Sequence, residues 1–81
     1  MKTTLTLYSR ADCHLCEDML ETLAIFSDEL NFQVDVVDID QNTSLRERYT
    51  TLVPVLALDG QEICHYFLDK VALCAALGKP F

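Results

Sequence analysis

Two cysteines at a short spacing are the residues of this chain best suited to chemistry. The stretch SRADCHLCEDM spans residues 9–19 and contains Cys13 and Cys16, two of the four cysteines in the sequence. In an intracellular chain a close cysteine pair is more often redox-active or metal-binding than a structural disulfide. The spacing leaves three interpretations open: a reactive dithiol, half of a metal site, or two small residues that only pack.

The surrounding pattern predicts separate roles for the two thiols. Cys13 lies where a loop ends and a helix begins. The free N–H groups and the positive end of a helix favour a thiolate, so we expect a Cys13 pKa below ~8.5. Cys16 follows on the same helical face, within reach for a disulfide. Cys13 is therefore the expected attacking thiolate, and Cys16 the expected resolving thiol that breaks the mixed disulfide.

Charged neighbours are expected to tune the pair. Arg10 precedes the helix and brings a fixed positive charge that would lower the Cys13 pKa or hold a substrate carboxylate. A protonated His14 would favour the thiolate further and make the pair a stronger oxidant. Asp12 would oppose both effects by repelling the thiolate, unless its side chain caps the helix.

The elements that must position these residues follow from apolar periodicity and turn signals. Alternating and β-branched runs predict strands at 4–8, 32–39, 53–58 and 61–65, and helical spacing predicts helices at 13–30, 44–49 and 70–77. The order is therefore β-α-β-α-β-β-α in an α/β fold. Helices between the first three strands favour parallel crossovers. The turn Asp59-Gly60 makes the fourth strand an antiparallel hairpin partner.

Some boundaries carry specific expectations. The near-continuous apolar run from Phe32 to Ile39 predicts a strand that is buried on both faces. Ser44 and Glu47 have the spacing of a capping box for the short helix. The last helix is expected to end at Gly78 and Pro80.

Composition limits the classes of function. The 81 residues suffice for one small domain, residues 1–81, and a 51% apolar content with two glycines and two prolines indicates a folded globule. The net charge of −7 disfavours binding to nucleic acids and to anionic membrane surfaces. No apolar run approaches the ~20 residues of a membrane span, and the start of the chain lacks the apolar core of a signal peptide. We therefore expect a monomer in the cytoplasm.

Three segments together resemble one known family. LYSRADCHLCEDM, VDID and TLVPVLALDGQEI are similar to the glutaredoxin family of the thioredoxin-like superfamily, and more closely to small bacterial glutaredoxin-like proteins. The resemblance covers nearly the whole chain and implies a four-stranded mixed sheet with helices on both faces. It implies that Cys13 is the nucleophile and Cys16 its partner. It also implies that Pro54 follows a cis bond and faces the dithiol, which would leave the Val53 backbone free to pair with an extended substrate.

The resulting functional prediction is a thiol–disulfide oxidoreductase without a bound cofactor. Its expected partners are a disulfide-containing protein or a glutathione mixed disulfide, and glutathione or a reductase would reduce the oxidised pair again. Two alternatives use the same residues. One is a metal-handling module that binds zinc or an iron–sulfur cluster through the cysteines. The other is a redox-inactive module that docks one partner protein at Val53 and Pro54.

One region departs from the family pattern. Glutaredoxins hold glutathione partly through small residues after the last strand, commonly Gly-Gly followed by Asp. Here Cys64 and His65 replace the glycines, and bulky residues 66–68 precede Asp69, which is expected to cap the last helix. The sequence therefore leaves open whether glutathione is the natural partner.

The two remaining cysteines are expected to be packing residues. Cys74 lies in the apolar run VALCAAL, and Cys64 ends a strand. A sharper alternative makes Cys64 a third redox thiol, or a zinc ligand beside the first cysteine pair and a histidine, His65 or His14.

Overall fold

The computed structural model describes residues 3–79. Its elements, in chain order, are β1 (Thr3–Ser9), α1 (His14–Leu30), β2 (Phe32–Asp38), the 3-10 helix η1 (Ile39–Gln41), α2 (Thr43–Tyr49), β3 (Val55–Leu58), β4 (Gln61–His65) and α3 (Lys70–Leu77). The predicted order is confirmed, with one turn of 3-10 helix added between β2 and α2. No helix in this part of the chain is both long and apolar enough to cross a membrane.

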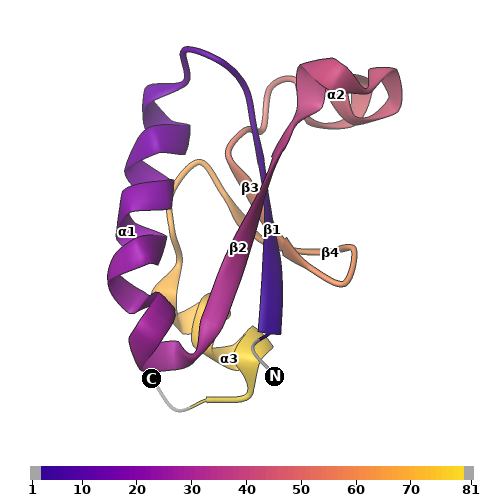
Figure 1. Cartoon of the computed structure of the whole chain (residues 1–81). Helices are drawn as coiled ribbons and strands as arrows, with labels where there is room; N and C mark the ends of the chain where they lie inside the picture. Colours follow the sequence, from indigo (N-terminus) through magenta and orange to yellow (C-terminus); the bar gives the residue numbers. More distant parts are fainter. Residues whose placement is uncertain (1–2, 80–81) are drawn as a thin grey trace.

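The four strands form one mixed sheet in the order β2-β1-β3-β4. β1 and β2 are parallel, as predicted, but β3 runs antiparallel to β1, so the predicted parallel crossover into the third strand is wrong. The lengths of the helices explain the difference. α1 has 17 residues, about 25 Å of helix, and returns the chain along the whole sheet. α2 has only 7 residues and stays at the end of the sheet where β2 finishes, so β3 starts there and runs back (Figure 1).

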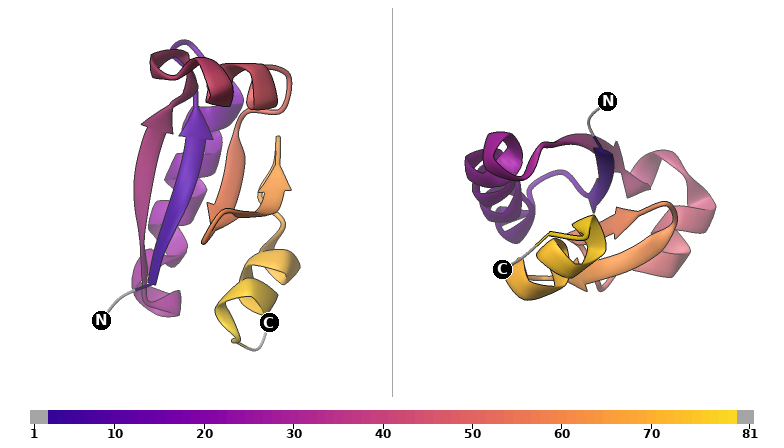
Figure 2. Two further views of the ribbon diagram at one scale, coloured as in Figure 1. Left: turned by 90° about the vertical axis from the view of Figure 1, so that its right-hand side faces the viewer. Right: turned by 90° about the horizontal axis from the view of Figure 1, so that it is seen from below.

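Helices cover both faces of the sheet, as the resemblance implied. The larger core cluster joins α1 and α3 to all four strands through Leu5, Leu7, Met19, Leu23, Leu30, Phe32, Leu56, Cys64, Leu73 and Cys74. A smaller cluster packs Ile39, Tyr49 and Val55 together, with Tyr8 stacked on Tyr49 at 4.7 Å between ring centroids. Successive strand residues point to opposite faces, so the two clusters lie on opposite sides. The view from below shows α1 and α2 on either side of the strands (Figure 2).

The second strand is less buried than its apolar sequence predicts. β2 lies at the edge of the sheet, and Val36 is 48% exposed. On the other face of β2, Gln33 donates a hydrogen bond of 2.7 Å to the hydroxyl group of Thr4 on β1. The prediction of burial on both faces is therefore wrong, because the number of covering elements depends on strand order, which the run of valines does not encode.

Turn and capping residues set several of the helix and strand boundaries. Asp59 and Gly60 both have positive φ, 51° and 82°, as a tight hairpin turn requires. Asp69 accepts a hydrogen bond of 3.0 Å from the Ala72 N–H and caps α3, as predicted. Gly78 ends that helix in the left-handed region at φ 69°, whereas the predicted stop at Pro80 lies outside the described residues.

The cap of α2 differs from the prediction. The helix begins at Thr43, so Asn42 is the capping residue and its side-chain oxygen accepts a hydrogen bond of 3.1 Å from the Leu45 N–H. Ser44 then lies inside the first turn and cannot cap it, so the capping box of Ser44 with Glu47 is wrong. Asparagine is among the best N-cap residues, and it comes two positions earlier.

Candidate redox site

Cys13 is held at the start of α1 by the turn that precedes it. Asp12 adopts the left-handed conformation at φ 58°, which aspartate tolerates better than most residues. The chain then enters an extended conformation at Cys13, the N-cap residue of α1. The Cys16 N–H points at the Cys13 Sγ atom over 3.2 Å, so the sulfur accepts one of the free N–H groups of the first turn. Cys13, and not Asp12, therefore caps the helix.

The two cysteines form a disulfide, and their Cα atoms are 5.2 Å apart. The structure therefore brings the predicted pair together. Their exposure differs: Cys13 is partly exposed at the surface, whereas Cys16 is only 5% exposed. A thiol that attacks an external disulfide must be accessible, and a thiol that resolves the intermediate need only reach its neighbour. The burial pattern is consistent with the roles expected for Cys13 and Cys16.

Arg10 is engaged with a carboxylate from a distant part of the chain. Its Nε and terminal nitrogen lie 3.1 and 3.0 Å from the two carboxylate oxygens of Asp40, which gives a bidentate ion pair. The pair ties the loop before α1 to η1. It also neutralises the charge of Arg10 and occupies donors that a substrate carboxylate would need.

His14 lies at the surface of the first turn. Its side chain is 97% exposed, and its Nδ1 atom lies 3.9 Å from a carboxylate oxygen of Glu17. The ring therefore sits beside an acidic partner on its own helix. The tuning roles of Arg10 and His14 stay predictions.

The segment before β3 lies next to the loop that carries Cys13. Tyr8 pairs with Val55 in the antiparallel register, so Val53 and Pro54 lie at the same end of the sheet as Ser9 and Arg10, which follow Tyr8. The Val53–Pro54 peptide bond is cis, as the resemblance implied. Pro54 is buried and Val53 is half-buried. Sheet register thus brings the two predicted substrate-binding residues to the end of the sheet where α1 begins.

Tyr66 fastens this segment at two points. Its backbone N–H donates to the Pro54 carbonyl oxygen over 2.9 Å, and its hydroxyl group donates to the Thr51 carbonyl oxygen. Tyr66 has a φ of 64°, a conformation that turns the chain out of β4 and is uncommon for an aromatic residue. The tyrosine has no sequence signal for this role, because the role depends on a carbonyl group 15 residues away.

A small cavity of about 90 Å³ lies between this turn and α1. It is lined by Leu15, Asp18, Met19 and Thr22 from α1 and by Tyr66, Phe67 and Leu68 from the β4–α3 connection. Leu15 stands between the two cysteines in sequence, so the cavity adjoins the helical turn that carries the disulfide. Phe67, at its rim, is 69% exposed.

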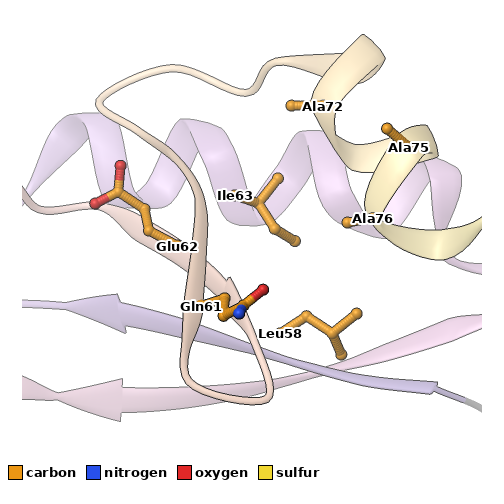
Figure 3. Close-up of a pocket in the computed structure, with 7 residues that line it drawn as sticks. All are labelled: Leu58, Gln61, Glu62, Ile63, Ala72, Ala75 and Ala76. Atoms are coloured by element: carbon orange, nitrogen blue, oxygen red, sulfur yellow. The ribbon is translucent and has the colours of Figure 1, made fainter.

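A larger pocket of about 280 Å³ lies away from the disulfide. It opens between the β3–β4 hairpin and α3, and Figure 3 shows its lining residues, Leu58, Gln61, Glu62, Ile63, Ala72, Ala75 and Ala76. The hairpin is at the end of β3 opposite Pro54. The lining contains neither a cysteine nor a histidine, so this pocket is not part of the redox site.

The other two cysteines are core residues. Cys64 and Cys74 are both buried and belong to the larger core cluster, which confirms that they pack. Burial raises the pKa of the Cys64 thiol, and the carboxylates of Asp69 and Glu62 add to the rise, while a hydrogen bond from the Asp69 backbone opposes it.

The zinc site considered for Cys64 is not assembled. Within residues 3–79, no three histidine, cysteine, aspartate or glutamate side chains come together as a metal site would require. His65 instead pairs through Nδ1 with a carboxylate oxygen of Glu62 at 2.8 Å.

Comparisons with known proteins agree with the fold. A family model described as a glutaredoxin-like domain (DUF836) matches residues 4–78. Uncharacterized proteins of Mycobacterium tuberculosis and Mycobacterium bovis are 33% identical over 78 residues, which covers 90% of this chain and 80% of theirs.

Several solved structures have folds similar to that of this chain. Protein Ne2328 from Nitrosomonas europaea is 38% identical with a TM-score of 0.84, covering 94% of this chain and 92% of that one. A protein from X. campestris is 37% identical with a TM-score of 0.72, covering 91% and 95%. Fasciola hepatica thioredoxin, at 19% identity and a TM-score of 0.59, covers 95% and 79% and shows the thioredoxin fold alone. The fold and the disulfide support a redox type of function in general, and the chain belongs to the glutaredoxin-like domain family (DUF836).

Proposed function

We propose that the protein is a thiol–disulfide oxidoreductase that works through Cys13 and Cys16. The observation that carries the proposal is the position of Cys13 as the N-cap of α1, where its sulfur accepts the Cys16 N–H over 3.2 Å. A backbone donor and the positive end of a 17-residue helix both favour negative charge on that sulfur. The accessible thiol is thus the one that the helix activates.

The reaction has two exchange steps. The Cys13 thiolate attacks one sulfur of a substrate disulfide, forms a mixed disulfide and releases the other substrate sulfur as a thiolate, which takes up a proton. The Cys16 thiol then loses its proton and attacks the Cys13 sulfur, which releases the second substrate thiol. The substrate gains two electrons and two protons, and the Cys13–Cys16 pair is oxidised to the disulfide. Two external thiols, from glutathione or a reductase dithiol, reduce the pair again.

The surroundings of the disulfide suit an extended substrate. The Val53 backbone is proposed to pair with the substrate chain beside its disulfide, in the manner of an added strand. One chain contains both thiols, so a monomer suffices, and the two sulfurs carry both electrons without a further cofactor. The chemistry fits the reducing conditions of the cytoplasm, where such a pair is kept available as a dithiol.

Two serine substitutions test the mechanism. Reduced Cys13→Ser protein is expected to lose turnover of a glutathione mixed disulfide and of a protein disulfide, because no nucleophile remains. Cys16→Ser protein is expected to accumulate the Cys13 mixed disulfide, seen as a mass increase that dithiothreitol removes. Cys74→Ala, which removes a buried core thiol, is the matched control and should keep turnover.

Three results would contradict the proposal. Full reductase activity in Cys13→Ser protein would exclude the attacking role. Stoichiometric zinc or iron in protein purified with reduced thiols would favour the metal-handling alternative. A Cys13–Cys16 potential outside the physiological range would favour the redox-inactive binding module.

A further inference from the structure

We propose that the site prefers protein disulfides whose cysteine is flanked by apolar and basic residues over glutathione mixed disulfides. The inference rests on the proposed function and names its substrate class. The docking surface consists of Leu15 on α1 and of Tyr66 and Phe67 after β4, and we refer to it as the aromatic rim. The occupant is an extended segment of a substrate protein.

The aromatic rim is apolar, exposed and rigidly held. Phe67 is 69% exposed and Tyr66 is 38% exposed, whereas most large apolar side chains within residues 3–79 are covered. The Tyr66 N–H and hydroxyl group bond to the Pro54 and Thr51 carbonyl oxygens, and the Phe67 N–H donates to the His65 carbonyl oxygen over 2.7 Å. The turn is therefore ordered before a ligand arrives, which reduces the entropy lost on binding.

The rim has room for one small aliphatic side chain. The cavity of about 90 Å³ between Phe67 and Leu15 matches a side chain of a few carbon atoms in volume. It lies beside the first two turns of α1, where Cys13 and Cys16 are. A side chain one or two positions from the substrate cysteine would reach it, since consecutive Cα atoms are ~3.8 Å apart.

The charges around the aromatic rim indicate which residues should flank the substrate cysteine. Asp18 lines the cavity, and Asp12 and Glu17 are exposed beside Cys13. Arg10 is the positively charged residue nearest to Cys13 in the sequence, and its guanidinium group already forms a bidentate ion pair with Asp40. The surface near the disulfide is therefore negative, in a chain of net charge −7, and lysine or arginine beside the substrate cysteine would complement it.

Glutathione has the opposite character. It is a tripeptide with two carboxylates, no apolar side chain and a net negative charge at neutral pH. Binding it here would require Arg10 to exchange Asp40 for a ligand carboxylate, and Asp18 and Glu17 would repel it. The same features that suit a basic, apolar segment thus disfavour glutathione.

Three substrates with the same small leaving thiol separate these cases. Each substrate is a mixed disulfide with that thiol. In the first, the cysteine belongs to a peptide in which it stands between leucine and lysine; in the second, glutamate replaces the lysine. The third is the mixed disulfide of glutathione. We expect kcat/KM for the lysine peptide to exceed the other two by about tenfold or more at low salt. The advantage should shrink as salt is raised from 20 to 500 mM, because exposed charges are screened.

Matched variants locate the surface. Phe67→Ser should lower kcat/KM for the lysine peptide about tenfold, through KM, and should lower kcat/KM for the glutathione disulfide far less. Ile25→Ser removes an equally exposed side chain, 72% exposed, further along α1 and should change neither. Asp18→Asn should reduce the preference for lysine over glutamate, whereas Glu29→Gln, near the far end of α1, should not.

The outcomes distinguish the two proposals. Turnover of all three substrates at similar rates, or a preference for glutathione, overturns the substrate class while the oxidoreductase stands. Equal effects of Phe67→Ser and Ile25→Ser overturn the aromatic rim as the docking surface. Failure to turn over any of the three substrates contradicts the oxidoreductase itself, and with it this inference.

Discussion

Replacing Tyr66 by phenylalanine tests how the segment before β3 is held. The change keeps the ring and the Tyr66 N–H bond to Pro54, and removes only the hydroxyl donor to the Thr51 carbonyl oxygen. A neutral hydrogen bond contributes about 1 kcal/mol, and water can replace part of this one because Tyr66 is 38% exposed. We expect a loss of about 0.5–1 kcal/mol in the free energy of unfolding, or about 3–6 °C in Tm.

The measurement is urea unfolding of the oxidised protein together with turnover of a protein disulfide. The midpoint should fall with an unchanged m-value, because the surface exposed on unfolding does not change. If the bond also orders the Thr51–Pro54 segment for substrate, KM should rise about two- to fivefold, the same energy expressed as binding, with kcat unaltered.

Tyr49→Phe is the matched control. The Tyr49 ring stacks on Tyr8 at 4.7 Å, and within residues 3–79 its hydroxyl group makes no hydrogen bond. The control should therefore change stability by less than about 0.5 kcal/mol and leave KM alone. Equal losses in the two variants, or a Tyr66→Phe protein as stable as the parent with the same KM, would refute the reasoning.

Two further predictions concern the helix cap and the buried thiol. Asn42→Ala should lower the free energy of unfolding by about 1 kcal/mol in urea titrations and Ser44→Ala by much less; the reverse order would restore the capping box. Burial raises the pKa of the Cys64 thiol above its ordinary value, so the unfolded chain releases this proton first as pH rises. The stability that Cys64 contributes is thus full below the pKa of an ordinary thiol and falls above it. The free energy of unfolding of Cys64→Ala protein should fall less steeply over that alkaline range than that of the parent. Equal slopes of free energy against pH in the two proteins would contradict a raised Cys64 pKa.

The candidate site was predictable where its signals are local. Cys13 and Cys16 form a disulfide at a helix start because both the spacing and the strand-to-helix turn lie within a few residues of each other. The partner of Arg10 was not predictable in this way, since Asp40 lies 30 residues further on. The same applies to Tyr66, whose sequence neighbours say nothing about Thr51.

The element order, the hairpin at Asp59-Gly60 and the cysteine pair at the start of α1 can all be read from the amino-acid sequence. These follow from periodicity, turn residues and caps, which act over one or two turns of chain. Three features are visible only in the folded protein: β3 runs antiparallel to β1, β2 is an edge strand, and Asp40 forms an ion pair with Arg10. Each of these depends on which distant segments meet in space. The surface that a substrate encounters was therefore set by packing, whereas the dithiol was already present in the sequence.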